Sequence, residues 1–383
     1  MRKIINLPFI KILEENLKSH SGLIQVLLGP RQVGKTTTIL HFLEKKLEGK
    51  YHYASADQVF NSDANWIIEQ WNIALKNKKL LVIDEIQKCQ NWAEVIKQLW
   101  DSLKRQKKTL QCVLLGSSSL KIQKGLTESL TGRFQLIPAF HWNFAETVKG
   151  YKLNFEDFLK YGGYPGAYKF ISSEDKWHDY IKNSIINTII EKDILQYHTV
   201  KSPALFRQAF DILMSYPAQE ISFTKLLGQI QDKGNVELVK NYLHMYEGAF
   251  LLKAIYKYSK KPVLTKSSSP KIIPMAPSLF FLTIRSEYRP DERGHIFEAV
   301  VGTQLVRTGH DLFYWRKNNN EVDYILRQGK KTWAIEVKSG RKKNPSSLMK
   351  FKEENPDALL IIITPDNYKE FEEDPMVFLN SYS

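Results

Sequence analysis

Cysteine is scarce in this chain, which has only Cys89 and Cys112 among 383 residues. The two cysteines show no paired spacing and no histidine pair lies nearby, which argues against a disulfide framework and against a zinc knuckle. A reducing compartment, the cytoplasm, is therefore expected.

Long apolar runs are also missing. No run reaches the roughly 18 residues that a membrane-spanning helix needs, and the longest, such as residues 359–363, predict buried strands. Over residues 1–20 apolar positions recur among Lys11, Glu14 and Glu15, which predicts an amphipathic helix rather than a signal peptide. We expect no membrane partner.

Acidic residues are few relative to basic ones: 41 Asp and Glu stand against 55 Lys and Arg, a formal net charge of +14. Such an excess favours a polyanionic partner, because Lys and Arg neutralise phosphates. Charge alone does not separate DNA from RNA or from an acidic protein, and solubility is the other explanation. Nucleic acid, DNA first, is the expected partner.

The length exceeds that of one hydrophobic core, so several domains are expected. Short apolar runs at 23–28, 51–54, 80–83 and 110–115 alternate with helical stretches, which predicts an α/β domain with a parallel sheet over 21–150. Helical spacing over 151–200 predicts a lid or connector.

The second half follows a different pattern. Three helical segments and an apolar strand over 201–260 have the order of a winged helix-turn-helix, although helical bundles without a DNA role look similar. Dense prolines and serines predict a linker over 261–278, and strands and helices resume over 279–383.

A phosphate-binding loop is predicted between the first strand and the first helix of the α/β domain. Residues 29–36 (GPRQVGKT) fit G-x-x-x-x-G-K-[ST] at every fixed position. Backbone amides of such a loop and the helix N-terminus face the phosphates of ATP. Lys35 is expected to reach the β and γ phosphates and Thr36 to bind Mg²⁺. The predicted nucleotide-binding residues are Gly29, Pro30, Arg31, Gln32, Val33, Gly34, Lys35, Thr36 and Thr37.

Two acids end the strand at 80–83. Asp84 is predicted to organise the Mg²⁺ shell together with Thr36, and Glu85 to orient or activate the attacking water. Ser117, at the end of the strand at 110–115, is placed as a sensor of the γ-phosphate or water, although serines there are commonly a helix cap. Arg133 is a candidate arginine finger, acting in cis or across a homo-oligomer interface, with a surface salt bridge as the alternative.

Taken as a series, five segments resemble prokaryotic AAA-type ATPases whose C-terminal half is a domain of unknown function with a nuclease-like core. The segments are 29–37 (GPRQVGKTT), 83–87 (IDEIQ), 116–119 (GSSS), 131–134 (TGRF) and 161–165 (YGGYP). By this resemblance Gly163 and Pro165 line the adenine pocket; composition alone predicts only a turn.

The resemblance extends to the C-terminal part, where residues 294–298 (GHIFE), 314–316 (YWR), 321–324 (EVDY) and 335–338 (IEVK) are similar to a PD-(D/E)xK nuclease core. Glu336 and Lys338, two apart on one strand, face the same side as Asp323, with Glu298 joining from a helix. Such a cluster binds Mg²⁺ and cleaves phosphodiesters. The alternative is that these charges are solvated strand faces paired across the sheet. Residues 275–278 (MAPS) depart from the acid- and glycine-containing turn of the family.

The combined expectation is an ATPase that handles nucleic acid. Its fold would comprise a P-loop NTPase (AAA-type) parallel sheet, a helical lid, a winged helix-turn-helix and a C-terminal α/β restriction-nuclease-like domain. The alternative is a nucleotide-switched signalling or scaffold protein with an inert nuclease fold. Salt-dependent DNA binding distinguishes the two.

Overall fold

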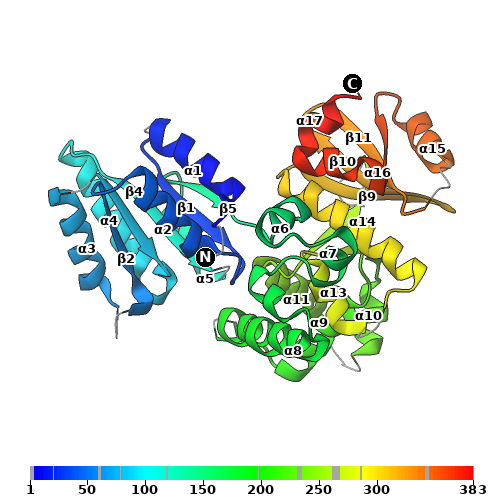
Figure 1. Cartoon of the computed structure of the whole chain (residues 1–383), viewed down its shortest axis with the longest axis horizontal. Coiled ribbons are helices and arrows are strands. Elements are labelled where there is room, and N and C mark those ends of the chain that lie inside the picture. Colours follow the sequence, from blue (N-terminus) through cyan, green and yellow to red (C-terminus); the bar gives the residue numbers. More distant parts are fainter. Residues whose placement is uncertain are drawn as a thin grey trace. The chain divides into compact units, whose positions relative to one another are not determined.

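The computed structural model describes residues 4–19, 21–58, 62–77, 79–117, 120–196, 198–230, 235–260, 268–284, 287–340 and 345–382. The chain forms two compact units (Figure 1). Unit 1 comprises residues 1–140 and 185–199, and unit 2 comprises residues 141–184 and 200–383. No helix in the described part of the chain has both the length and the apolarity to cross a bilayer.

Unit 1 is built on a five-stranded parallel sheet in the order β2-β3-β4-β1-β5. Its strands and helices are β1 (Ile24–Gly29), β2 (Tyr51–Ser55), β3 (Leu80–Asp84), β4 (Gln111–Ser117), β5 (Phe134–Pro138), α1 (Pro8–Ser19), α2 (Lys35–Lys46), α3 (Ala64–Asn77), α4 (Trp92–Arg105) and α5 (Leu120–Ser129). The predicted parallel α/β architecture is confirmed, and α1 lies within the segment 1–20 for which an amphipathic helix was expected.

The apolar runs of the sequence form the buried central strands of this sheet. Strands β1 and β3 are buried at every residue, as expected for central strands covered by helices on both faces. Helix α1 contacts α2, while α3, α4 and α5 contact one another in turn. Right-handed crossovers place α2 on one face and α3 to α5 on the other. The carboxyl ends of β1, β3 and β4 therefore meet at one edge of the sheet.

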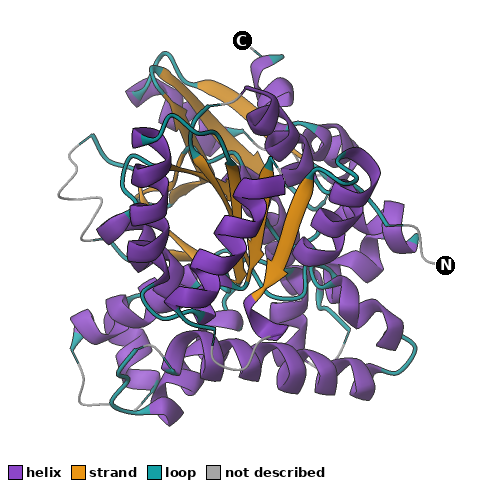
Figure 2. Cartoon of the chain, turned by 90° about the vertical axis from the view of Figure 1, so that its left-hand side faces the viewer, coloured by secondary structure: helices purple, strands orange, loops and turns teal. Residues whose placement is uncertain are grey.

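Unit 2 contains a seven-stranded mixed sheet in the order β12-β11-β10-β9-β7-β8-β6. Its strands are β6 (Gln219–Glu220), β7 (Leu252–Lys257), β8 (Lys271–Pro274), β9 (Asp311–Lys317), β10 (Asn320–Gln328), β11 (Lys331–Val337) and β12 (Leu359–Ile363). Its helices are α6 (Phe144–Tyr151), α7 (Phe155–Tyr161), η3 (Pro165–Phe170), α8 (Glu174–Asp179), α9 (Pro203–Met214), α10 (Phe223–Gln229), α11 (Val236–Gly248), α13 (Pro277–Ile284), α14 (Pro290–Arg307), α15 (Ser346–Glu354), α16 (Pro365–Glu373) and α17 (Pro375–Asn380). Figure 2 shows helices packed around the strands.

The predicted elements of the second half are present. Helices α9, α10 and α11 and strand β7 match the three helices and the strand expected over 201–260. The strands expected after residue 310 are β9 to β12. The assignments as a winged helix and as a nuclease fold stay predictions.

The linker predicted over 261–278 is wrong for its described part. Strand β8 lies between β7 and β6, and α13 begins at Pro277. The prolines lie at the ends of these elements and do not interrupt them. Pro274 is the last residue of β8, and Pro277 is the first residue of α13, where the missing N–H of proline is not needed. Residues 261–267 lie outside the described part.

The helical segment predicted over 151–200 is helical but is divided between the units. Its π-helices are η4 (Tyr180–Ile186) and η5 (Ile189–Leu195). Residues up to 184 belong to unit 2, whereas 185–199 pack with unit 1, where Ile189, Ile190 and Ile194 are fully buried. Residue 193 is thereby placed near the loop that follows β1.

Candidate nucleotide site

The loop between β1 and α2 is folded around Lys35. Its ammonium donates to the carbonyl oxygens of Gly29 at 2.8 Å and of Pro30 at 2.6 Å. Gly34, which precedes the first helical residue, has a φ of 88°, a left-handed conformation that glycine adopts without a steric penalty. The loop amides and the positive end of the α2 dipole are thus gathered at the carboxyl edge of the sheet, an arrangement that binds phosphates.

The other predicted loop residues differ in exposure. Pro30 and Val33 are buried, Arg31 and Thr36 are half-buried, and Gln32 and Thr37 are exposed. Burial lowers the pKa of Lys35 to about 8, even though the charges of Glu85 and Asp84 oppose the shift. A phosphate group beside this lysine would favour its charged form.

Asp84 accepts three hydrogen bonds at the end of β3. Its Oδ2 accepts from the Thr36 hydroxyl at 2.7 Å and from the Tyr53 hydroxyl at 3.0 Å, and its Oδ1 accepts from the Glu85 amide at 2.9 Å. Mg²⁺ in such sites takes one or two protein oxygens together with phosphate oxygens and waters. The paired Thr36 and Asp84 oxygens fit that requirement.

Glu85 occupies a left-handed backbone conformation with a φ of 53°, which is uncommon for a residue with a side chain. Burial raises the pKa of its carboxyl group, the charge of Asp84 adds to the shift, and the charges of Arg31 and Lys35 oppose it. A raised pKa suits a group that accepts a proton near neutral pH.

Gln87 connects two of the predicted catalytic residues. Its Nε2 donates to a carboxylate oxygen of Glu85 and to the Ser117 hydroxyl at 3.1 Å. Its Oε1 is buried without a hydrogen-bond partner in the structure. Ser117 lies opposite Gly29 in the β1–β4 pairing. The structure therefore brings Glu85, Gln87 and Ser117 together beside the phosphate loop.

Arg31 forms an ion pair with a residue far away in the sequence. Its Nε and Nη2 each donate to one carboxylate oxygen of Asp193 at 2.6 Å. The Asp193 side chain is 2% exposed and that of Arg31 is 26% exposed. This bidentate pair fastens the segment 185–199 to the phosphate loop within unit 1.

Arg133 lies at the opposite edge of the sheet, so the structure does not support its prediction as a finger acting in cis. Its carbonyl accepts from the Ile24 amide at the start of β1, whereas the phosphate loop follows the end of that strand. The five residue steps from Ile24 to Gly29 separate the two edges by about 16 Å. The guanidinium instead pairs with Asp101 at 2.9 and 3.0 Å, the salt bridge that was the alternative.

Gly163 and Pro165, predicted from the resemblance to line an adenine pocket, belong to unit 2. Gly163 has a φ of 109°, and a Cβ at this position would lie 2.4 Å from the Cβ of Ala276. Pro165 is buried at the start of η3. Packing within unit 2 accounts for the glycine, and the adenine role stays a prediction.

The four residues of the predicted nuclease site do lie close together in unit 2, and each has a protein partner, although the second carboxylate oxygen of Glu336, Oε2, is buried without a hydrogen-bond partner. Asp323 Oδ2 accepts from the Val337 amide at 2.7 Å, and Glu336 Oε1 accepts from Lys338 at 2.5 Å. Burial, followed by the charge of Asp323, raises the pKa of Glu336 to about 7.

A fifth residue, Lys271, enters this cluster from β8. Its ammonium lies 2.8 Å from Glu298, 2.9 Å from Glu321 and 3.9 Å from Asp323. Burial lowers the pKa of Lys271, but the charges of Glu298, Asp323 and Glu321 outweigh it and raise the pKa above its ordinary value. Among the residues that the structure describes, no three His, Cys, Asp or Glu side chains are placed to hold a metal ion. The cluster does not fit the Mg²⁺ that the nuclease prediction requires.

Sequence reasoning missed five residues that contact the predicted sites: Tyr53, Gln87, Asp193, Lys271 and Glu321. Gln87 lies within the segment 83–87, and Glu321 is two residues before Asp323 on one strand, so local spacing contained a signal for both. Tyr53 lies next to β3 only through the sheet order. Asp193 and Lys271 come from distant segments, and no local pattern points to them.

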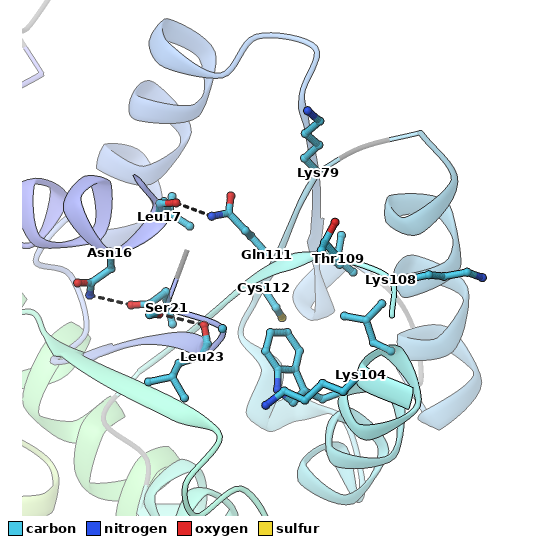
Figure 3. Close-up of a pocket in the computed structure, with 15 residues that line it drawn as sticks. Asn16, Leu17, Ser21, Leu23, Lys79, Lys104, Lys108, Thr109, Gln111 and Cys112 are labelled. Atoms are coloured by element: carbon cyan, nitrogen blue, oxygen red, sulfur yellow. Dashed lines mark hydrogen bonds between the residues drawn. The ribbon is translucent and has the colours of Figure 1, made fainter. Parts of the chain in front are cut away.

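A cavity of about 310 Å³ also lies in unit 1 (Figure 3). Its walls include Leu23, Lys79 and Gln111, at the amino ends of β1, β3 and β4. The side-chain amide of Gln111 donates from Nε2 to the Leu17 carbonyl at 2.5 Å (Figure 3). The phosphate loop follows the carboxyl end of β1, so this cavity is not the nucleotide site.

Fold and site together define an AAA-type P-loop domain in unit 1. Residues 21–148 match the family model described as an AAA domain, which confirms this class for that part of the chain. Residues 152–282 and 293–381 match two further families, each described as a domain of unknown function, DUF8612 and DUF4143. The expected C-terminal domain of unknown function is thus present, while its nuclease core stays a prediction.

Curated relatives come from archaea and bacteria. An uncharacterized protein of Methanocaldococcus jannaschii is 26% identical over 330 residues, which cover 79% of this chain and 72% of the relative. An uncharacterized protein of Mycobacterium tuberculosis is 25% identical over 334 residues, 83% of this chain and 71% of the relative.

Among solved structures, the RuvB Holliday junction branch migration motor of Thermotoga maritima matches 64% of this chain and 86% of its own chain, at 16% identity and a TM-score of 0.32. A TM-score of 0.32 is too low to carry any conclusion about this chain.

Proposed function

We propose that unit 1 binds Mg-ATP and hydrolyses it. The observation that carries this proposal is the convergence of the phosphate loop, the Thr36–Asp84 pair and the Glu85–Gln87–Ser117 group at one edge of the sheet. Bound Mg²⁺ would supply positive charge to the phosphate oxygens. Thr36 and Asp84 would hold it.

The chain's own residues supply the remaining requirements. Lys35 brings a positive charge to the phosphates, and the loop amides orient them. Glu85 is placed to accept a proton from water, and Gln87 fixes its carboxylate while its free Oε1 can accept a hydrogen bond from that water. Ser117 completes the group near the position expected for the γ-phosphate.

The test is Mg²⁺-dependent phosphate release from ATP by the native chain and by Glu85→Gln. We expect turnover to fall at least 100-fold in Glu85→Gln while ATP still binds, because the variant keeps the shape but not the base. ATP binding without turnover in the native chain would reduce the proposal to a nucleotide-binding role. Equal turnover in both chains would contradict the role of Glu85.

We further propose that the ATPase handles nucleic acid, DNA first, through residues 201–274. The order α9, β6, α10, α11, β7, β8, with β8 antiparallel to both β6 and β7, supports a winged helix. The net charge of +14 supports a polyanionic partner. Affinity for duplex DNA that falls steeply with salt is expected, and negligible affinity at low salt would contradict it.

A second candidate, a nucleotide-switched scaffold, is favoured by the charges on α11. Lys240 lies 3.8 Å from Glu237 on the same helix, and Glu247 lies 3.0 Å from Lys253. A helix whose charges are paired in this way offers little net charge to phosphates and suits a protein partner. Failure of DNA binding together with preserved ATP turnover would select this candidate.

One further residue belongs to this proposal: Arg133 would act in trans within a homo-oligomer. Mixing Lys35→Ala with Arg133→Ala chains tests the trans role of Arg133, because shared sites would restore part of the turnover. No recovery, combined with normal turnover of Arg133→Ala alone, would leave Arg133 as the surface partner of Asp101.

A further inference from the structure

One buried cation stands among the carboxylates of the C-terminal cluster. Lys271 is 1% exposed, and its ammonium contacts Glu298 of α14 and Glu321 of β10 at 2.8 and 2.9 Å. The rings of Tyr314 and Tyr324 enclose it, with centroids 5.8 and 5.6 Å from the nitrogen. A lysine so buried is uncommon unless carboxylates neutralise it.

Lys271 contacts oxygens that a metal bound in this cluster would need. The carboxylates available to such a metal are those of Glu298, Asp323 and Glu336. Mg²⁺ requires carboxylate oxygens at about 2.0–2.1 Å. The ammonium already binds Glu298 and lies 3.9 Å from Asp323. Metal and lysine therefore compete for the same oxygens.

The formal charges of the cluster explain why a cation is needed at the position of Lys271. Four carboxylates, those of Glu298, Glu321, Asp323 and Glu336, face two ammonium groups, those of Lys271 and Lys338. Lys338 is bound to Glu336 at 2.5 Å. Without Lys271, three acidic side chains would repel one another in a poorly solvated place, which costs free energy unless another cation enters.

The lysine comes from a different part of the chain than the acids. It is contributed by β8, which lies within the match to the first domain of unknown function, residues 152–282. Glu298, Glu321 and Asp323 lie within the match to the second, residues 293–381. The ion pairs thus join β8 to α14 and β10 across two family modules of the same unit.

We propose that Lys271 is a built-in cation that takes the place of the divalent metal, so that the C-terminal cluster is a structural joint and binds no Mg²⁺ in the native chain. A buried ammonium provides charge but no open position for a water or a phosphate oxygen, so the cluster has no means of cleaving a phosphodiester. The proposal goes beyond ATP hydrolysis and does not depend on it.

Mn²⁺ binding by the nucleotide-free chain tests the proposal, measured by electron paramagnetic resonance of free Mn²⁺. The native chain and its Glu298→Gln/Asp323→Asn variant are expected to bind the same amount, because the cluster contributes no site. Lys271→Ala is expected to gain one Mn²⁺ site, and Lys271→Ala/Glu298→Gln/Asp323→Asn to lose it again. Mn²⁺ binding by the native chain that disappears in Glu298→Gln/Asp323→Asn would overturn the proposal.

Thermal unfolding with and without Mn²⁺ provides a second readout. Lys271→Ala is expected to melt several degrees below the native chain and to recover when Mn²⁺ is added, whereas the native chain is expected to respond to Mn²⁺ no more than its Glu298→Gln/Asp323→Asn variant does. Lys271→Met/Glu298→Gln removes one charge of each sign, so it should melt close to the native chain even if Lys271→Ala fails to fold. A charge-matched variant as unstable as Lys271→Ala would show that the lysine acts by packing, and would overturn the proposal.

Discussion

The ion pair between the phosphate loop and the distant helical segment predicts an asymmetric response to mutation. Arg31→Met leaves the Asp193 carboxylate buried, at 2% exposure, without its bidentate partner. Removing one partner of a buried ion pair costs about 3–5 kcal/mol. Asp193→Asn should cost less, about 1.5–3 kcal/mol, because the Arg31 side chain is 26% exposed and can reach water.

The double variant Arg31→Met/Asp193→Asn should be less destabilised than the sum of the two single changes, because it leaves no buried charge without a partner. The coupling free energy of the cycle is therefore expected at about 2–3 kcal/mol, the upper range for residues in contact.

Hydrogen exchange of backbone amides in residues 185–196, followed by mass spectrometry, is a local assay for this pair. Each 1.4 kcal/mol lost from the opening free energy accelerates exchange about tenfold. Arg31→Met should thus accelerate exchange by roughly two to three orders of magnitude, up to the limit set by opening of the whole segment.

Arg133→Met is the matched control, because it breaks an equally bidentate pair whose side chains are 30% and 34% exposed. Exposed pairs contribute about 0–1 kcal/mol, so exchange in 185–196 should stay unchanged. The reasoning is refuted if Asp193→Asn accelerates exchange as much as Arg31→Met, or if the double variant shows the additive sum.

Three other predictions concern the nucleotide site and the start of α6. Burial holds the pKa of Lys35 at about 8 in the nucleotide-free chain, so its ammonium is present below pH 8 and is lost above it. The dissociation constant of ATP should therefore rise by up to about tenfold per pH unit between pH 8 and 10, and much less steeply in Lys35→Arg. Equilibrium titration with a fluorescent nucleotide measures this dissociation constant. Gln87→Ala should lower single-turnover ATP hydrolysis by roughly 10–100-fold and leave the dissociation constant of ATP within about twofold, since Gln87 contacts Glu85 and Ser117 rather than the phosphate loop. Glu372→Ala should destabilise unit 2 by about 2–3 kcal/mol in denaturant unfolding, because the buried carboxylate accepts from the first two amides of α6 at 2.8 and 2.9 Å.

The following comparisons distinguish these specific effects from effects of other groups or of misfolding. A pH dependence of Lys35→Arg as steep as that of the native chain would assign the titration to another group. Weaker ATP binding by Gln87→Ala with normal turnover would place Gln87 at the phosphates instead of at Glu85. Glu373→Ala, at the exposed neighbouring position, should change stability by less than about 0.5 kcal/mol.

Much of unit 1 could be predicted because its signals are local. Eight consecutive residues define the phosphate loop, and apolar runs ending in Asp84 and in Gly116–Ser117 mark strand ends. Parallel strands bring those ends to one edge, which is why residues 36 and 84 meet. Arg133 shows the limit of this reasoning, because the motif identified the residue but not the edge of the sheet on which it lies.

The parts that escaped prediction depend on contacts between distant segments. Asp193 pairs with a residue 162 positions earlier, and the pattern around it predicts only a helix. Strand β8 has four residues among prolines, so composition predicted a linker, whereas its pairing with β6 and β7 decides the structure. Short strands gain stability from their neighbours in a sheet rather than from their own sequence.

The C-terminal cluster shows that one arrangement of carboxylates is compatible with two kinds of cation. Strand alternation does place Asp323 and Glu336 together, with Glu298 joining from α14. Carboxylates gathered in this way require a cation, and an ammonium satisfies the charge as a metal does. On our proposal the cation is the ammonium of Lys271, which lies 27 residues before Glu298 on strand β8. A carboxylate motif therefore predicts that a cation is bound, and only the residues that other segments contribute decide whether it is a metal.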